Sequence, residues 1–140
     1  MLRMAAFLVL ALLLTACGSQ PTAAQVVPIE LTEFAIESPL TVFKVGTPYR
    51  FVISNPGAIN HEFVMLAENE EHDMQGNTEA EDGHGESTTG SMLHVGESQL
   101  TPGASVSIEH TFTEPGEYEF GCYLPGHYAA GMHAKITVIP

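Results

Sequence analysis

From residue 28 to the end of the chain, short apolar stretches alternate with Pro- and Gly-containing turns, and no stretch keeps a helical period beyond a turn or two. The alternation is clearest between Ser105 and Phe112, where every second residue is of a polar type that usually faces solvent. The pattern predicts an all-β protein, a β-sandwich or barrel of about seven to eight strands. The expected strands are 27–36, 40–45, 49–54, 62–66, 105–112, 117–122 and 135–139.

The N-terminus has the pattern of an export signal. Arg3 precedes ten apolar residues, 5–14, a length that is typical of the apolar core of a signal peptide and too short for a bilayer-spanning helix. The run ends in Leu-Thr-Ala-Cys at 14–17, which resembles a bacterial lipoprotein cleavage site. We therefore expect a signal peptide at 1–16, a lipid on Cys17, a tether at 17–27 and one domain at 28–140.

Both ways of processing this signal predict export. An ordinary secretory signal cut near Ala16 would leave Cys17 as a free thiol, whereas lipidation would anchor the protein to a membrane, facing the periplasm or the cell exterior. If Cys17 carries a lipid, Cys122 is the only thiol left in the chain. A lone thiol in an oxidising compartment is expected to be protected or used.

Length and charge exclude some functions. A chain of 140 residues allows one domain. It carries 17 acidic against 4 basic residues, a formal net charge of −13, so it has no basic patch for phosphates. We expect a monomer that does not bind nucleic acid.

Residues 68–98 do not follow the strand pattern. This segment holds nine acidic residues and no Lys or Arg, so we expect a flexible insertion. One interpretation is a solvated acidic loop, and the other is a tract that collects metal ions with low affinity. The metal-binding side chains of the tract would be His72, Met74, His84, Met92 and His94.

The chemistry-bearing motif lies near the C-terminus. Cys122, His127 and Met132 form the pattern C-x4-H-x4-M, and Cys122 falls on the apolar face of its strand. Thiolate, imidazole and a weak thioether are the ligands of a mononuclear electron-transfer copper site, which usually takes a second histidine. His61, at the start of an earlier strand, is the candidate. Zinc fits less well, because its structural sites favour several Cys and His and make little use of Met.

The motif, together with Asn-His-Glu-Phe-Val at 60–64 and the strand 112–122, resembles the cupredoxins, or type 1 blue copper proteins, such as plastocyanin, azurin, rusticyanin and sulfocyanin. The resemblance runs from Val27 to Pro140 and implies a Greek-key barrel. It implies a copper plane of His61, Cys122 and His127 with Met132 as axial ligand. The loop spacing is similar to that of rusticyanin and sulfocyanin. The amino-acid sequence of the loop is also similar to that of small exported copper-tolerance proteins.

One position departs from the family pattern. In several cupredoxins an Asn follows the upstream histidine and helps to fix the copper loop, whereas here Glu62 follows His61 and Asn60 precedes it. His110, on the apolar face of its strand, is expected to be a hydrogen-bonded core residue.

The sequence therefore predicts a membrane-tethered one-electron carrier with one type 1 copper and a redox protein as partner. The alternative is a protein of copper tolerance that sequesters copper or delivers it to a copper-handling protein. An enzyme is not expected, because the four ligands fill the copper site. An apolar collar around His127 is expected to dock the partner, and it consists of Leu124, Pro125, Tyr128 and Ala129.

Overall fold

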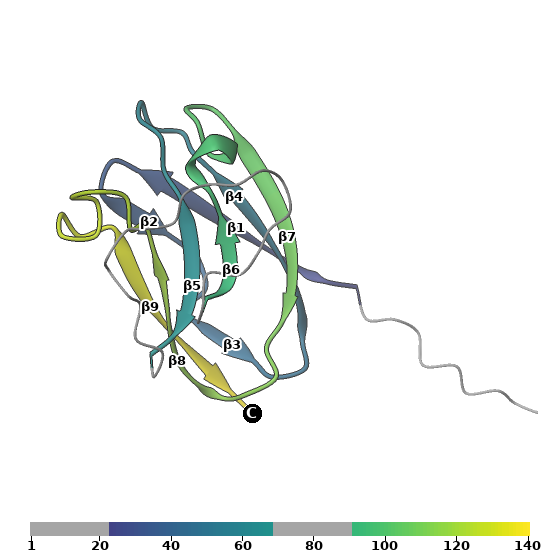
Figure 1. Cartoon of the computed structure of the whole chain (residues 1–140). Helices are drawn as coiled ribbons and strands as arrows, with labels where there is room; N and C mark the ends of the chain where they lie inside the picture. The colour runs from purple at the N-terminus through teal and green to yellow at the C-terminus, as the bar shows by residue number, and fades with distance from the viewer. Residues whose placement is uncertain (1–22, 69–90) are drawn as a thin grey trace, which may run out of the picture.

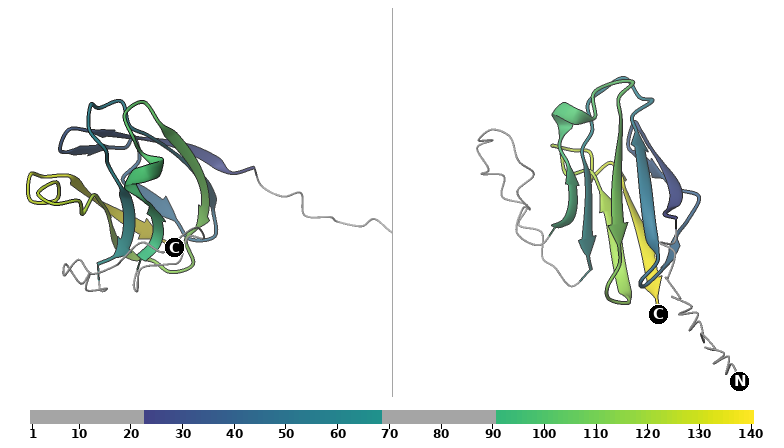
Figure 2. Two further views of the ribbon diagram at one scale, coloured as in Figure 1. Left: turned by 45° about the horizontal axis from the view of Figure 1, so that its top comes forward. Right: turned by 90° about the vertical axis from the view of Figure 1, so that its right-hand side faces the viewer.

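The computed structural model describes residues 23–68 and 91–140. The expected signal peptide, Cys17 and most of the insertion lie outside these residues. Within them the chain forms nine strands and one short 3-10 helix, arranged as two sheets that face each other across the core (Figures 1 and 2). None of the described helical structure is long and apolar enough to cross a bilayer.

The strands divide between a four-stranded and a five-stranded sheet. The first has the order β2-β1-β4-β7, with β1 (Gln25–Thr32), β2 (Ala35–Glu37), β4 (Pro48–Ser54) and β7 (Ser105–Thr111). The second has the order β3-β9-β8-β5-β6, with β3 (Val42–Lys44), β5 (Phe63–Ala67), β6 (Ser91–Val95), β8 (Gly116–Gly121) and β9 (His133–Ile139). The pairs β1·β4 and β3·β9 are parallel, and the other neighbours are antiparallel.

The all-β prediction is confirmed, but two details differ. The stretch expected as one strand, 27–36, is two strands, because the chain turns at Glu33 and Phe34, and Phe34 takes a positive φ of 63°. The insertion is shorter than expected, because its last part forms β6 and the 3-10 helix η1 (Glu97–Gln99). Leu93 and Val95 turn inward from β6, a period-two pattern that the acidic composition around it hides.

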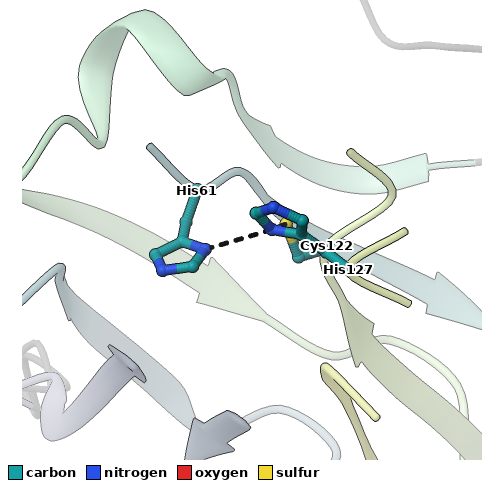
Figure 3. Close-up of side chains that lie close together, drawn as sticks. All are labelled: His61, Cys122 and His127. Carbon is teal, nitrogen blue, oxygen red and sulfur yellow. Dashed lines mark hydrogen bonds between the residues drawn. The ribbon is translucent and has the colours of Figure 1, made fainter. Parts of the chain in front are cut away.

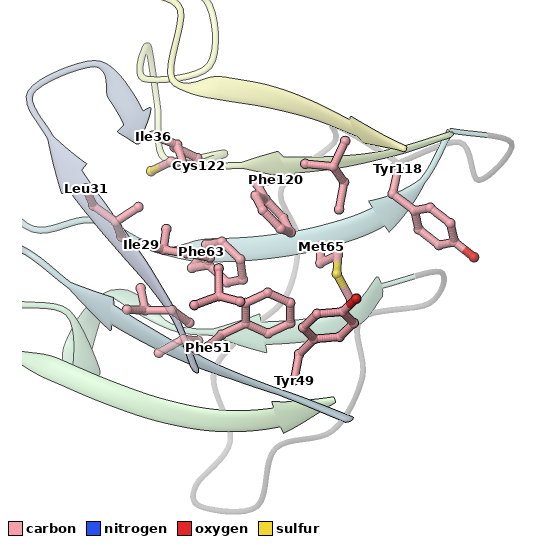
Figure 4. Packing of buried hydrophobic residues seen from close by; sticks show 14 of the residues in the cluster. Ile29, Leu31, Ile36, Tyr49, Phe51, Phe63, Met65, Tyr118, Phe120 and Cys122 are labelled. Atoms are coloured by element: carbon pink, nitrogen blue, oxygen red, sulfur yellow. The ribbon is translucent and has the colours of Figure 1, made fainter. Parts of the chain in front are cut away.

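The core is a layer of aromatic and aliphatic side chains between the sheets. The ring of Phe43 lies near its centre, with edge-on contacts to Tyr49, Phe51 and Phe120 at 5.0–6.1 Å between ring centroids. Burial of each such ring stabilises the fold by about 1.5–3 kcal/mol. Cys122 lies at one end of this core, away from Tyr49 and Tyr118 at the other end (Figure 4).

The same end of the sandwich carries three connections. These are the β4–β5 connection, the β8–β9 loop and the helix η1, all at the end opposite the C-terminus (Figure 1). The fold therefore brings His61, just before β5, to the same end as Cys122, just after β8.

Candidate metal centre

Three side chains from two connections converge at this end of the core. His61 lies two residues before β5, Cys122 directly follows β8, and His127 lies in the β8–β9 loop. The Nδ1 atoms of the two histidines are 3.3 Å apart, and the Cys122 Sγ atom is 3.4 Å from His127 Nδ1 (Figure 3). His61 and Cys122 are fully buried, and His127 is partly exposed. The three donor atoms therefore surround one point.

Asn55 holds the connection that carries His61. Its side chain is fully buried and donates to the carbonyls of Ile59 and Leu100, at 2.8 and 2.7 Å, and its Oδ1 accepts the N–H of Gly57. The N–H of His61 itself donates to Leu100 O at 3.2 Å. In the sequence this Asn is part of an Asn-Pro-Gly turn, so its structural role was not predicted.

Glu33 supports the same connection from the β1–β2 turn. Its carboxylate accepts the N–H of Ala58, and this bond lowers the pKa of Glu33. A Cβ on Gly57 would lie 2.7 Å from Glu33 Oε1, so a larger residue there would push this carboxylate out of its present position.

Backbone hydrogen bonds close the β8–β9 loop. The N–H of Cys122 donates to Met132 O at 3.0 Å, and the N–H of Met132 donates to His127 O at 3.1 Å. Gly126 and Gly131 take positive φ values of 85° and 108° on either side of this turn. Met132 is fully buried beside Cys122 in the core cluster.

Glu62 links the two ligand-bearing connections. Its backbone N–H points at Cys122 Sγ from 3.5 Å, and its carboxylate accepts the N–H of Tyr123 at 2.8 Å. The departure from the family pattern at this position therefore replaces an amide by a carboxylate that still fastens the loop. An N–H aimed at the sulfur stabilises a thiolate there.

Burial sets the protonation of the donors. Burial, and then the neighbouring His127, lowers the pKa of His61, so its imidazole is neutral near pH 7 and has a free lone pair. Burial raises the pKa of the Cys122 thiol. A metal ion that binds here must displace the thiol proton.

The donor geometry fits a first-row metal ion. Bonds of about 2.0 Å to nitrogen and about 2.3 Å to sulfur, in a trigonal or tetrahedral arrangement, separate the donors by about 3.3–3.8 Å. The two distances on His127 Nδ1, 3.3 and 3.4 Å, agree with that range. His61 Nε2 is buried and has no hydrogen-bond partner within 23–68 and 91–140. Nδ1 is therefore the nitrogen of this ring that faces the other two donors. Two imidazoles, one thiolate and a buried Met select copper among such ions.

The expected docking collar is only partly exposed. Pro125 and Ala129 are exposed, but Leu124 packs against the core and the Tyr128 hydroxyl donates to Glu119. Two apolar residues that were not predicted lie at this end of the fold. Phe34 is 44% exposed with its ring edge-on to His127, and Ile59 is 40% exposed in the connection that leads to His61.

The secondary copper residues are separate from this centre. His72, Met74 and His84 lie outside the described residues. Met92 and His94 are exposed on β6, and His94 Nε2 lies 3.5 Å from Glu62 Oε2. Within the described ranges, His61, Cys122 and His127 are the one group of three or more metal-binding side chains.

His110 is half-buried and does not belong to the fully buried core that was expected, and its ring lies 4.7 Å from that of Phe112. Its Nε2 atom is buried without a hydrogen-bond partner among the described residues, so the expected hydrogen bonding is wrong for this atom. The cause is the apolar ring packing on the inner face of β7. Burial also lowers the pKa of His110.

A two-sheet β-sandwich with a buried thiol and two imidazoles converging at one end defines a copper protein of the cupredoxin class. The pattern of the copper-binding proteins of the plastocyanin/azurin family matches residues 34–139. The chain belongs to this family.

Individual relatives support the assignment. The chain is 32% identical over 126 residues to the copper-resistant cuproprotein CopI of Rubrivivax gelatinosus. The matched region covers 86% of this chain and 70% of that protein. A CopI of Pseudomonas aeruginosa is 32% identical over 120 residues, covering 69% of this chain and 66% of that protein.

Solved structures share the fold. Auracyanin of Roseiflexus castenholzii superposes with a TM-score of 0.62 at 25% identity, covering 85% of this chain and all (100%) of that chain. Rusticyanin of Thiobacillus ferrooxidans superposes with a TM-score of 0.56 at 16% identity, covering 84% and 79%.

Proposed function

We propose that this chain is an exported type 1 copper protein that carries one electron at a time. His61, Cys122 and His127 hold the copper, and Met132 is its weak fourth ligand. The observation that carries the proposal is the convergence of two Nδ1 atoms and one Sγ atom at the buried end of the core. Bound copper supplies a one-electron couple at this point.

The chain's own residues keep the donors still during electron exchange. Asn55 and Glu33 hold the connection before His61, while backbone bonds to Met132 close the loop around His127. A site that does not move between oxidation states needs little rearrangement when an electron enters or leaves. The filled ligand set also leaves no open position for a substrate, which argues against an enzyme.

Electrons are proposed to pass through the exposed edge of His127. His127 is the only one of the three donors that is not fully buried. Pro125 and Ala129 are exposed two residues before and after it, and the ring of Phe34 contacts its imidazole, so that together they provide an apolar surface for a redox partner. A small apolar contact of this kind suits a short-lived encounter.

Copper tolerance is the second candidate role. It is favoured by the two relatives described as copper-resistant cuproproteins, each 32% identical to this chain. In this role the centre would sequester copper or deliver it to a copper-handling protein, and the side chains of 68–98 would bind additional ions. Met92 and His94, both exposed on β6, would take part.

Metal stoichiometry separates the two roles. An electron carrier is expected to bind one copper per chain, whereas a sequestering protein binds more and loses the excess when residues 69–90 are deleted. The deletion must stop before Ser91, because β6 begins there and pairs with β5. A variant with Met92→Leu and His94→Gln tests whether the side chains of β6 bind any of the additional copper.

Redox behaviour tests the copper assignment itself. A potentiometric titration of the copper-loaded protein should show one reversible one-electron step. Met132→Leu should raise the reduction potential while the strong colour remains, because the copper loses its fourth donor, and electron donation stabilises Cu(II) more than Cu(I). An unchanged potential would remove Met132 from the ligand set.

A further inference from the structure

Two tyrosines of the ligand loop converge on one carboxylate. The Tyr123 hydroxyl donates to Glu119 Oε1 at 3.0 Å, and the Tyr128 hydroxyl donates to Glu119 Oε2 at 3.2 Å. Tyr123 directly follows Cys122, and Tyr128 directly follows His127. One oxygen of the Glu119 carboxylate therefore holds the neighbour of Cys122, and the other oxygen holds the neighbour of His127.

The rings of these tyrosines are stacked. The Tyr123 and Tyr128 rings are nearly parallel, with centroids 5.0 Å apart and an interplanar angle of 14°. The Tyr128 ring also stacks on His133, at 4.6 Å and 21°. Gly121 makes room for this arrangement, because a Cβ there would lie 2.8 Å from the Tyr123 ring. The stack covers the outer face of the sheet where β8 meets the loop.

Glu119 sits on a rigid part of the fold. It belongs to β8, which lies between β5 and β9, and it pairs with Leu66 and Lys135 in the two neighbouring strands. Its side chain is only 16% exposed, and Oε2 also lies 3.6 Å from His133 Nδ1. Because its strand is paired on both sides, the Glu119 carboxylate is held in place and can anchor the β8–β9 loop.

We propose that Glu119 is a positioning residue that clamps the β8–β9 loop and so fixes the spacing between Cys122 and His127. Its consequence for the metal rests on the proposed copper site. The clamp acts through both hydroxyls, one on each side of the Leu-Pro-Gly segment, 124–126.

The chain offers a matched control in Glu117. It lies on the same strand, two residues away and therefore on the same outer face, and its carboxylate accepts the Thr137 hydroxyl at 3.0 Å. Glu117→Gln and Glu119→Gln remove the same charge, but only the second removes an oxygen that holds a loop tyrosine. A general effect of charge predicts equal results for the two variants.

Hydrogen exchange of the metal-free protein tests the clamp without copper. In Glu119→Gln the amides of His127, Ala130 and Met132, which close the loop, should exchange about tenfold faster, because a hydrogen bond to a charged group is lost. Glu117→Gln should leave them unchanged. Equal rates in both variants would overturn the clamp.

Copper spectra test the consequence. In Glu119→Gln the intensities of the visible bands should change and copper loss should be about tenfold faster, whereas Glu117→Gln should match the unaltered protein. Tyr123→Phe with Tyr128→Phe should reproduce this result, and adding Glu119→Gln to that pair should change nothing more. Loop amides that loosen with an unaltered spectrum would keep the clamp and overturn its role at the copper.

Failure of the proposed function has a different signature. If the unaltered protein forms no intense copper band, the copper assignment is wrong, yet the exchange data still decide whether Glu119 clamps the loop. Urea unfolding of the metal-free variants checks that each remains folded, and the Phe variants provide the milder change.

Discussion

The ring of Phe34 stands edge-on to the imidazole of His127, with centroids 5.5 Å apart and an interplanar angle of 87°. Phe34 is at the turn between β1 and β2 and takes a φ of 63°, a conformation that is unfavourable for a bulky side chain. The same turn carries Glu33, which supports the connection before His61. The β1–β2 turn is thus a third loop of the copper centre, in contact with the surroundings of both histidines.

Replacing Phe34 should separate the copper site from the stability of the fold. In Phe34→Gly, relief of about 1–2 kcal/mol of backbone strain offsets the higher entropy of glycine in the unfolded chain. We therefore expect little change in the free energy of unfolding of the metal-free protein. Copper loss to a chelator should be roughly fivefold faster, because an aromatic edge contact of about 1 kcal/mol is lost.

Ile59→Ala is the control, since Ile59 is similarly exposed and lies in the connection to His61. It should leave the rate of copper loss unchanged. A Phe34→Gly variant that is strongly destabilised but keeps its copper as tightly as before would contradict this role of Phe34.

The proposed docking surface predicts an effect on electron exchange alone. Ala129 is exposed beside His127, so Ala129→Glu should lower the electron self-exchange rate, measured by NMR on mixed oxidised and reduced protein, by about tenfold through like-charge repulsion. The visible spectrum should stay the same. Leu124 is unsuitable for this test, because it packs against the core.

Thr113→Glu adds the same charge in the turn before β8, far from the ligand loop, and should leave self-exchange nearly unchanged. Equal slowing in both variants would mean that net charge, and not the surface at His127, controls the rate.

Much of the centre is encoded locally in the sequence. Cys122 and His127 share one loop at a fixed spacing, and period-two alternation predicts the strands that carry them. The sequence predicts His61 as a ligand because a second imidazole completes the donor set of thiolate, imidazole and thioether. The structure brings these three side chains together as that chemistry requires.

The parts that were not predicted depend on contacts between distant segments. Glu33 and Phe34 lie within an apolar alternating stretch that favours one continuous strand, and only the packing of the turn against His127 and Ala58 reveals the break. The contact of Glu119 with two loop tyrosines depends on the sheet and the loop together. The sequence does not predict strand β6, because the acidic composition of 68–98 indicates a flexible insertion and the alternation around Leu93 and Val95 is short.

Acid should weaken the metal-free fold through its buried histidines. Burial lowers the pKa of His110 and of His61 in the folded state, so below about pH 6.5 the unfolded chain binds protons first and the free energy of unfolding falls as the pH falls. His110→Leu should reduce this fall between pH 7.5 and pH 5, measured by urea unfolding. An unaltered pH dependence would contradict the assignment to His110.

The lipid anchor is tested by the fate of Cys17. Cys17→Ser should move the protein from the membrane fraction to the soluble exported fraction, because the expected cleavage site requires the thiol for lipid attachment. Mass spectrometry of the unaltered protein should find a lipid on the first mature residue. Unchanged partitioning would remove the anchor from the account and leave export by an ordinary signal.

The most direct test of the copper centre is a Cu(II) titration of the soluble domain, residues 18–140, with visible absorption and bound copper measured together. An intense thiolate-to-copper band that saturates at one copper per chain, and is lost in Cys122→Ser, is the predicted result. Binding of copper without this band, or a band that survives in Cys122→Ser, would contradict a site built from His61, Cys122 and His127.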